Sequence, residues 1–220
     1  MLPLFPLGLV LLPGLVLPLH VFEDRYRVLV GELLERPEDQ RDIGIIAIRQ
    51  GREVGEEGVA ALHEVGTVAR LRRVSPYPDG RYDIVVTGGQ RFRLGALERG
   101  KPYLRGHVDL LRDEVGDEAL AGVLATAVGE ATGDYLAALR SASGEGLDEL
   151  DLPSDPTALS YAVAAALLID LEDRQRLLAA TDATTRLRAE LALLRHETRL
   201  LSVLSSAPAP ELARTPVNPN

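Results

Sequence analysis

The sequence predicts an α+β protein, with a β-rich part at residues 1–113 and a helical part at residues 114–205. Two observations support this prediction. Short apolar runs bounded by proline and glycine occur before residue 113, whereas from Asp117 onward the apolar residues recur with a helical period of about 3.6 residues. We therefore expect a folded or partly closed sheet followed by four helices. Residues 206–220 carry four prolines and few apolar groups, which predicts a disordered tail.

The opening 22 residues are almost entirely apolar, but prolines 3, 6, 13 and 18 interrupt them. Each proline would cost about 3 kcal/mol in a helix interior, which disfavours a membrane span. No basic residue precedes Arg25, so the positive region of a signal peptide is missing as well. We expect short buried strands with a turn at Pro13-Gly14, in a cytoplasmic protein.

The next elements alternate between one helix and several strands. Apolar spacing predicts a helix from Glu23 to about Arg36, ended by Pro37. The continuous apolar run at 43–48 is typical of a strand covered on both faces. Residues 65–74 and 81–87 are expected to pair as a hairpin across the Tyr77-Pro78-Asp79-Gly80 turn, with further strands at 91–94 and 103–111.

Four helices are predicted in the second part. The first follows Asp117, and Asp155-Pro156 is a good cap and first turn for the second. Asp170 and Asp182 are expected to cap the third and the fourth. Leucines 187, 191, 194 and 201 form a seam on the last helix. This seam either lies inside the bundle or supports a homo-oligomer, and the first interpretation is favoured.

Composition excludes several classes of chemistry. The chain has no cysteine, which removes disulfides, thiol nucleophiles and thiolate metal sites. Its four histidines are far apart in the sequence, so no metal or other cofactor is expected. Residues 1–113 hold 16 basic and 16 acidic side chains, whereas residues 114–220 hold 8 and 17, which accounts for the net charge of −9. This distribution disfavours binding to nucleic acids in general or to anionic membranes.

Catalytic motifs are incomplete. Residues 95–102 match a phosphate-binding loop up to the last position, where Pro102 replaces the required hydroxyl and removes a backbone donor. Lys101 is the only lysine, and an exposed ammonium stays protonated and cannot serve as a base. We therefore expect a non-enzyme with no catalytic residues, and a cryptic hydrolase is the third hypothesis.

Basic residues gather on the predicted hairpin and the strand after it. With Arg81 and the aromatic residues Tyr77, Tyr82 and Phe92, they would form a phosphate-tracking surface. This nucleic-acid-binding patch is the second functional hypothesis, and a solvated strand face neutralised by nearby acids is the favoured interpretation. The candidate residues are Arg70, Arg72, Arg73, Arg91 and Arg93.

A set of short strings gives the chain a resemblance to a known family. The strings are Leu2-Pro3-Leu4-Phe5-Pro6-Leu7, Leu12-Pro13-Gly14, Leu17-Pro18-Leu19, Val65-Gly66-Thr67-Val68-Ala69, Pro78-Asp79-Gly80, Gly89-Gln90-Arg91-Phe92 and Pro102-Tyr103-Leu104. In this order, and with the stretch 168–201, the chain resembles the amino-terminal domain of ATP-dependent Lon proteases over about residues 1–205. The strings around Phe5 and Phe22 look closest to those of short, free-standing bacterial members of the family, so we expect no ATPase or peptidase module.

The resemblance implies a β-rich PUA-like pseudo-barrel followed by a four-helix bundle. It also implies recognition of substrate polypeptides and self-association rather than catalysis. Our leading hypothesis is a non-catalytic module that binds exposed apolar polypeptide segments. We expect a shallow apolar groove where the opening strands meet the first helix and the hairpin, although Phe22 and Tyr26 are at least as well explained as core. The candidate residues are Pro18, His20, Phe22, Tyr26, Tyr77 and Phe92.

Overall fold

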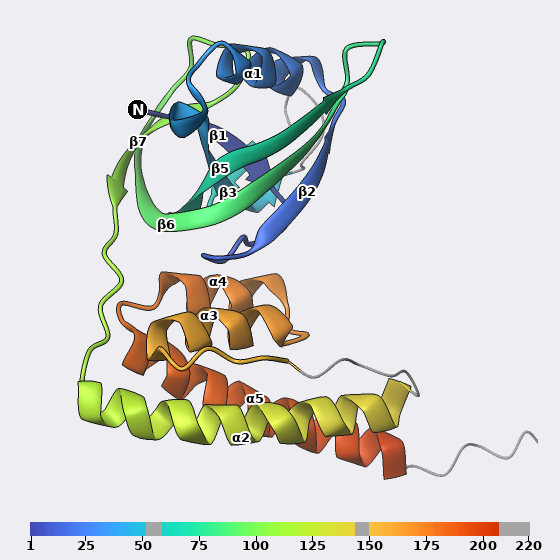
Figure 1. The fold of residues 1–220 in the computed structure, drawn as a ribbon, viewed down its shortest axis with the longest axis vertical. Helices are drawn as coiled ribbons and strands as arrows, with labels where there is room; N and C mark the ends of the chain where they lie inside the picture. Colours follow the sequence, from blue (N-terminus) through green and yellow to red (C-terminus); the bar gives the residue numbers. More distant parts are fainter. Residues whose placement is uncertain (52–58, 144–149, 207–220) are drawn as a thin grey trace, which may run out of the picture.

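Strands gather at one end of the molecule and four helices at the other, with the linker after β7 joining them (Figure 1). A computed structural model describes residues 1–51, 59–143 and 150–206. The strands are β1 (Leu2–Leu7), β2 (Val16–Val21), β3 (Asp42–Gly51), β4 (Val59–Leu62), β5 (Val65–Pro76), β6 (Tyr82–Glu98) and β7 (Arg105–Leu110). The helices are α1 (Asp24–Leu34), a short 3-10 turn (Glu38–Gln40), α2 (Glu118–Ser143), α3 (Pro156–Ala166), α4 (Leu171–Ala179) and α5 (Ala183–Ser206).

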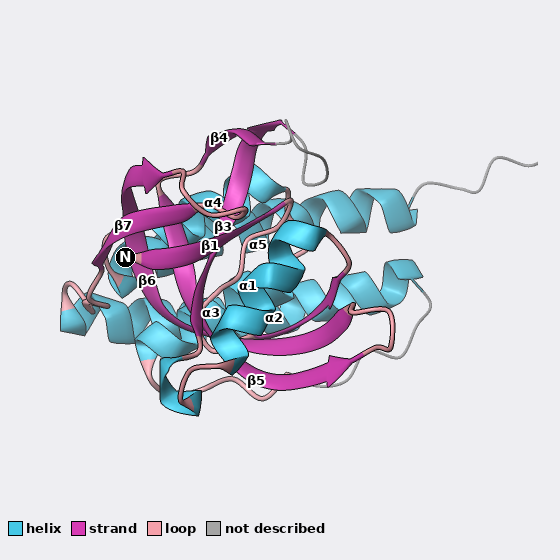
Figure 2. Ribbon diagram, turned by 90° about the horizontal axis from the view of Figure 1, so that it is seen from above, coloured by secondary structure: helices cyan, strands magenta, loops and turns pink. Residues whose placement is uncertain are grey.

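The sheet closes into a pseudo-barrel, which confirms the predicted fold class. Its strand order is β1-β7-β6-β5-β3, and β3 pairs back to β1 in parallel, with Leu4 opposite Gly44. Viewed from above, the strands curve around a common interior, and α1 lies over one end (Figure 2). Two strands lie outside this ring: β4 pairs with the end of β3, and β2 pairs with the beginning of β6, from Tyr82 to Thr87.

Some predicted elements differ from the structure. The strands expected at 81–87 and 91–94 are parts of one long strand, β6, which stays continuous through irregularities in its pairing with β5 and β7. Strand β4 and the 3-10 turn were not predicted. The predicted loop at 51–58 lies mostly outside the described residues, as do 144–149 of the loop expected at 141–152 and 207–220 of the expected tail.

The first half of the apolar opening segment is largely buried in the core. Leu4, Phe5 and Leu7 in β1 are buried, as are residues 10–12 after it. On one side they pack with residues of α1, β3, β5 and β6, and on the other side Leu4 packs with Phe92 in the barrel interior. Val10 and Leu12 contact the helical part. Most of the segment from Leu2 to Leu12 is therefore buried, because α1 and neighbouring strands cover one face of β1 and the barrel interior covers the other.

Helix starts follow the predicted caps. The carboxylate of Asp155 accepts from the backbone N–H of Ala158 at 2.8 Å, and Asp170 accepts in the same way at the start of α4. Asp182 caps α5 by accepting from the N–H of Thr185 at 2.7 Å. These contacts satisfy amide groups that a helix start leaves without partners, so the local sequence alone places three helices.

The leucine seam lies within the helical part. Leu187 and Leu194 are fully buried among residues of α2, α3 and α5, with Leu191 and Leu201 packed at the edge of the cluster. The seam therefore stabilises the bundle, and self-association of the chain stays a prediction. Among the described residues, no helix has the length and apolarity needed to cross a membrane.

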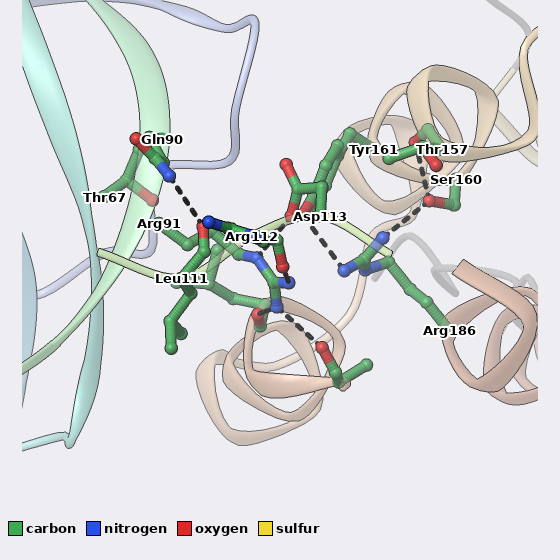
Figure 3. A network of polar contacts seen from close by, with 12 residues as sticks. Thr67, Gln90, Arg91, Leu111, Arg112, Asp113, Thr157, Ser160, Tyr161 and Arg186 are labelled. Atoms are coloured by element: carbon green, nitrogen blue, oxygen red, sulfur yellow. Dashed lines mark hydrogen bonds and ion pairs between the residues drawn. The ribbon is translucent and has the colours of Figure 1, made fainter. Parts of the chain in front are cut away.

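Arg91 joins the barrel to the helices at a buried polar contact (Figure 3). Its Nε donates to Asp113 Oδ1 at 2.8 Å, and its Nη1 donates to the carbonyl oxygens of Leu178 and Ala180 at 2.8 and 2.6 Å. Tyr161 on α3 donates to the same Asp113 oxygen at 2.7 Å.

An apolar cluster surrounds this contact. It includes Val10, Leu12, Ala47 and Val65 from the barrel and Tyr161, Ala164, Leu177 and Leu178 from α3 and α4. The side chain of Gln175 on α4 also donates to the carbonyl oxygen of Val65 at 2.9 Å. The two parts therefore share one interface with a buried apolar core.

Candidate functional site

Three side chains form an exposed aromatic rim where β2 ends and the β5–β6 turn approaches it. The Phe22 ring is 49% exposed and Tyr77 is 40% exposed. His20 lies between them, with its ring centroid 6.2 Å from that of Phe22 and 5.9 Å from that of Tyr77. We call His20, Phe22 and Tyr77 the aromatic rim. Exposed aromatic rings held close together offer a large apolar contact area at little cost in side-chain entropy.

Asp83 on β6 holds two members of the aromatic rim. His20 Nδ1 lies 2.6 Å from Asp83 Oδ1, and the Tyr77 hydroxyl donates to Asp83 Oδ2 at 2.5 Å. The His20 contact follows from the sheet, because these residues are directly opposite in the β2–β6 pairing. The hydrogen bonds from Tyr77 and then His20 hold the pKa of the Asp83 carboxyl below its usual value. Both bonds favour the ionised carboxylate, which therefore keeps the two rings in place.

The turn that carries Tyr77 is fixed to α1. Gly80 has φ +83°, a left-handed conformation that glycine adopts without steric cost. Its carbonyl oxygen accepts from Arg27 Nε at 2.8 Å, and the carbonyl oxygen of Asp79 accepts from Arg27 Nη2 at 3.2 Å. Arg27 Nη1 also donates to Asp24 in the first turn of α1. The aromatic rim is therefore organised by contacts from α1, β2 and the hairpin.

A small cavity opens beside the rim. It holds about 50 Å³ and is lined by Phe5, Leu7, Leu19, His20, Val21, Phe22, Glu23 and Tyr26. A space of this size admits a few water molecules or a short aliphatic side chain. Aromatic side chains of a ligand would have to lie across the rim rather than enter the cavity.

The six predicted binding residues are only partly brought together. Pro18 is exposed on β2, and His20 and Phe22 continue the same strand and its end. Tyr26 is 4% exposed and stacks on Phe5 with centroids 4.0 Å apart, so it is core, as the alternative interpretation held. Phe92 is fully buried with Leu4 and Ile46, so its placement in a groove is wrong. Its position in β6 faces the barrel core, because the long strand carries it past the hairpin.

The predicted arginine patch is not continuous. Arg91 is 1% exposed and serves the interface with the helices, so it cannot contact phosphate. Arg70 is held by both carboxylate oxygens of Asp42. Arg72 and Arg73 are exposed near one end of β5, whereas Arg93 pairs with Val65 at the other end. Two exposed arginines and one distant arginine are a poor match to a phosphate-tracking stripe.

Sequence reasoning missed the residues that hold the rim in place. Asp83 and Arg27 were assigned to no site, although both contact the turn or its aromatic residue. The local sequence treats Asp83 only as one of the acids near the basic patch, and its partner His20 on β2 is 63 residues away. In the described parts of the chain, no group of three or more His, Asp or Glu side chains is placed to hold a metal ion.

This arrangement defines a class of protein: a two-part α+β domain, in which a pseudo-barrel bearing an exposed aromatic rim is packed on a helical bundle. The chain belongs to the ATP-dependent protease La (LON) substrate-binding domain family, whose sequence profile matches residues 1–196. The predicted family is therefore confirmed.

Individual relatives agree with this assignment. The chain is 28% identical over 222 residues to Lon protease 2 of Myxococcus xanthus, covering 97% of this chain and 26% of that protein. It is 30% identical over 203 residues to Lon protease of Escherichia coli strain K12, covering 91% of this chain and 25% of that protein. The chain thus spans about a quarter of the length of these curated relatives.

Two solved structures share the fold. The Lon N-terminal domain protein from Xanthomonas campestris superposes with a TM-score of 0.62 at 26% identity, covering 87% of this chain and 96% of that chain. The N-terminal domain of Mycobacterium avium complex Lon protease superposes with a TM-score of 0.65 at 19% identity, covering 88% and 97%. Both parts of the present fold therefore occur together in Lon amino-terminal domains.

Proposed function

We propose that this protein is a non-catalytic polypeptide-binding module that recognises exposed apolar segments at the aromatic rim, and that it acts in the cytoplasm. The observation that carries the proposal is the pair of exposed rings, Phe22 and Tyr77, held on either side of His20. Aromatic side chains with a polar edge dominate the energetics of many protein interfaces. The family description, a substrate-binding domain, supports the same proposal.

The environment of Lys101 supports a binding role over hydrolysis. Its ammonium lies 2.8 Å from Glu32 Oε1 on α1, and the Lys101 side chain is 40% exposed. A lysine that acts as a general base is usually buried or placed beside another cation. Lys101 is instead partly exposed and paired with a carboxylate, so it is poorly placed for a serine–lysine mechanism.

Substitution of the two exposed rings tests the proposal. The probe is fluorescently labelled, reduced and carboxymethylated α-lactalbumin, a soluble chain without native structure, and binding is measured by anisotropy. Phe22→Ala and Tyr77→Ala are each expected to weaken binding by about 30-fold, which corresponds to about 2 kcal/mol for an exposed anchor. Their free energies of unfolding should change by less than about 1 kcal/mol, because neither ring is buried.

A matched control is Val123→Ala, which removes an exposed apolar side chain from α2. It should leave binding unchanged. The proposal is wrong if both ring variants bind the probe as the unaltered protein does, or if Val123→Ala weakens binding equally. Binding through phosphate-seeking arginines would instead fall steeply with salt, whereas apolar docking would not.

A further inference from the structure

Strand β2 is an edge of the sheet. It pairs with β6 along its whole length, from Val16 opposite Thr87 to Val21 opposite Tyr82. No strand in the described part of the chain pairs with its other side. In Figure 1 this free side faces outward at the right of the barrel. An edge strand presents unpaired backbone N–H and C=O groups, which form a template for another extended chain.

The residues that face this free edge can be identified from the pairing. In an antiparallel pair, alternate residues direct their backbone groups toward the partner and away from it. The N–H of Gly88 donates to the carbonyl oxygen of Leu15 at 2.8 Å, so the backbone groups of Leu15 point toward β6. The backbone groups of Leu17, Leu19 and Val21 also point toward β6, because these residues follow at intervals of two. Val16, Pro18 and His20 therefore direct their backbone groups to the free edge. The position of Pro18 fits this alternation, since proline is tolerated in an edge strand where its missing N–H would point outward.

The outward positions are also the exposed ones. Val16 is 63% exposed, and Pro18 and His20 are exposed, whereas Leu17 and Leu19 are partly covered by the core. Phe22 follows directly at the end of the strand as part of the aromatic rim. Six strand residues span about 20 Å. A free backbone edge therefore leads directly to the proposed apolar contact surface.

We infer that the free edge of β2 binds an extended segment of the client polypeptide as an added strand, which runs toward the aromatic rim. The inference rests on the proposed function and specifies how the client is held. Backbone hydrogen bonds to Val16, Pro18 and His20 supply affinity that does not depend on client sequence, and the rim selects apolar side chains. This combination suits a module that binds many unfolded chains.

Pro18 favours a client chain over a second copy of this protein. In a ladder of hydrogen bonds between β2 and a client strand, the carbonyl oxygen of Pro18 can still accept an N–H from the client. Only one bond is lost, the one that the missing N–H of Pro18 would donate. When two copies pair through β2, each brings its own proline, so the ladder lacks two donors. Proline in an edge strand is a recognised means of limiting such self-pairing.

Two substitutions at one position test the inference. The probe is a fluorescent nonapeptide, Lys-Val-Thr-Val-Phe-Val-Thr-Val-Lys, and binding is measured by anisotropy. Val16→Pro removes an outward N–H and no bond to β6, and it should weaken binding about tenfold. Val16→Thr keeps the N–H with a similar shape, and it should change binding by less than about twofold. Pro18→Ala adds an outward donor and should tighten binding several-fold.

A second measurement leaves the protein unaltered, in case Val16→Pro disturbs folding. The probe is N-methylated at alternate residues, in one phase or in the other. We expect one phase to abolish binding and the other to retain it, because only every second residue of an added strand bonds to β2. Equal effects of the two phases, or equal binding by Val16→Pro and Val16→Thr, would overturn the inference.

Two other outcomes are also decisive. If Phe22→Ala and Tyr77→Ala weaken binding while Val16→Pro and both methylated probes bind normally, the edge inference fails and the proposed function stands. If Pro18→Ala promotes dimers in sedimentation without tightening probe binding, the edge pairs with a second copy, and the inference is again overturned.

Discussion

Replacement of Arg91 by methionine tests how the barrel and the helices hold each other. The guanidinium is buried and donates to Asp113 and to the carbonyl oxygens of Leu178 and Ala180. These carbonyls lie at the carboxyl end of α4, where a positive charge also interacts favourably with the helix dipole. Methionine fills a similar volume without any donor. The substitution therefore removes every polar contact of Arg91 and keeps most of its packing.

The expected loss of unfolding free energy follows from the acceptor groups that the substitution leaves without a donor. Each carbonyl oxygen that loses its donor in a buried site costs about 1 kcal/mol. The Asp113 side chain is 30% exposed and keeps its bond from Tyr161, so loss of its cation costs about 1 kcal/mol rather than the larger penalty of a fully buried charge. The sum is about 3 kcal/mol. With a urea slope of about 2 kcal/mol per molar, the midpoint should fall by about 1.5 M.

Urea unfolding followed by circular dichroism and by tyrosine fluorescence measures this change. The matched control is Arg93→Met, an exposed arginine two residues along the same strand, which should change stability by less than about 0.5 kcal/mol. Arg91→Lys should lie between the two, because one ammonium cannot reproduce the guanidinium geometry. A loss for Arg91→Met no larger than that for Arg93→Met would refute the reasoning about this interface.

Three further predictions concern other parts of the molecule. Burial raises the pKa of Glu190 well above its ordinary value of 4.5, so the folded state retains a proton that the unfolded state releases. Its stabilising contribution is complete below pH 4.5 and declines as the pH rises toward the folded-state pKa. Glu190→Gln should therefore remove up to about 1.4 kcal/mol of decline per pH unit in urea titrations above pH 4.5. Parallel profiles for the two proteins would contradict this. Gly66→Ala should destabilise the protein by more than about 2 kcal/mol in urea unfolding, because the added Cβ would lie 2.6 Å from the carbonyl oxygen of Ile45 and 2.5 Å from the Phe92 ring. The control is Gly31→Ala, which has open space around the added Cβ and should not destabilise the protein. The purified protein should neither hydrolyse ATP nor cleave casein, and turnover that co-purifies with it and is lost in Lys101→Ala would show otherwise.

Features that depend on a few neighbouring residues could be predicted. The acids at 155, 170 and 182 begin three helices, and the apolar spacing of Tyr26, Leu29, Val30 and Leu33 gives the buried face of α1. The turn at Gly80 follows from its conformational freedom. The family resemblance supplied the pseudo-barrel that these local signals leave undetermined. Part of the candidate site was also predicted, since His20, Phe22 and Tyr77 do lie together.

Exposure of particular side chains could not be predicted in the same way. Phe22 and Tyr26 are close in the sequence, but one is half exposed and the other stacks on Phe5, because β2 ends and α1 begins between them. Phe92 and Arg91 both belong to a strand whose pattern suggested a surface. Their burial results from the closure of the ring around Phe92 and the docking of α4 on Arg91.

From the sequence alone, most strands and the five longer helices could be predicted, together with the start of most of them and the classes of chemistry that are disfavoured. Hydrogen-bond capping, side-chain periodicity and residue composition are local properties, so they can be read without knowing the rest of the chain. Only the tertiary structure decided that His20 meets Asp83, that Arg91 lies inside and that β2 keeps a free edge. Each of these depends on which distant strand or helix a segment pairs with, and that choice is made by the free energy of the whole packed molecule.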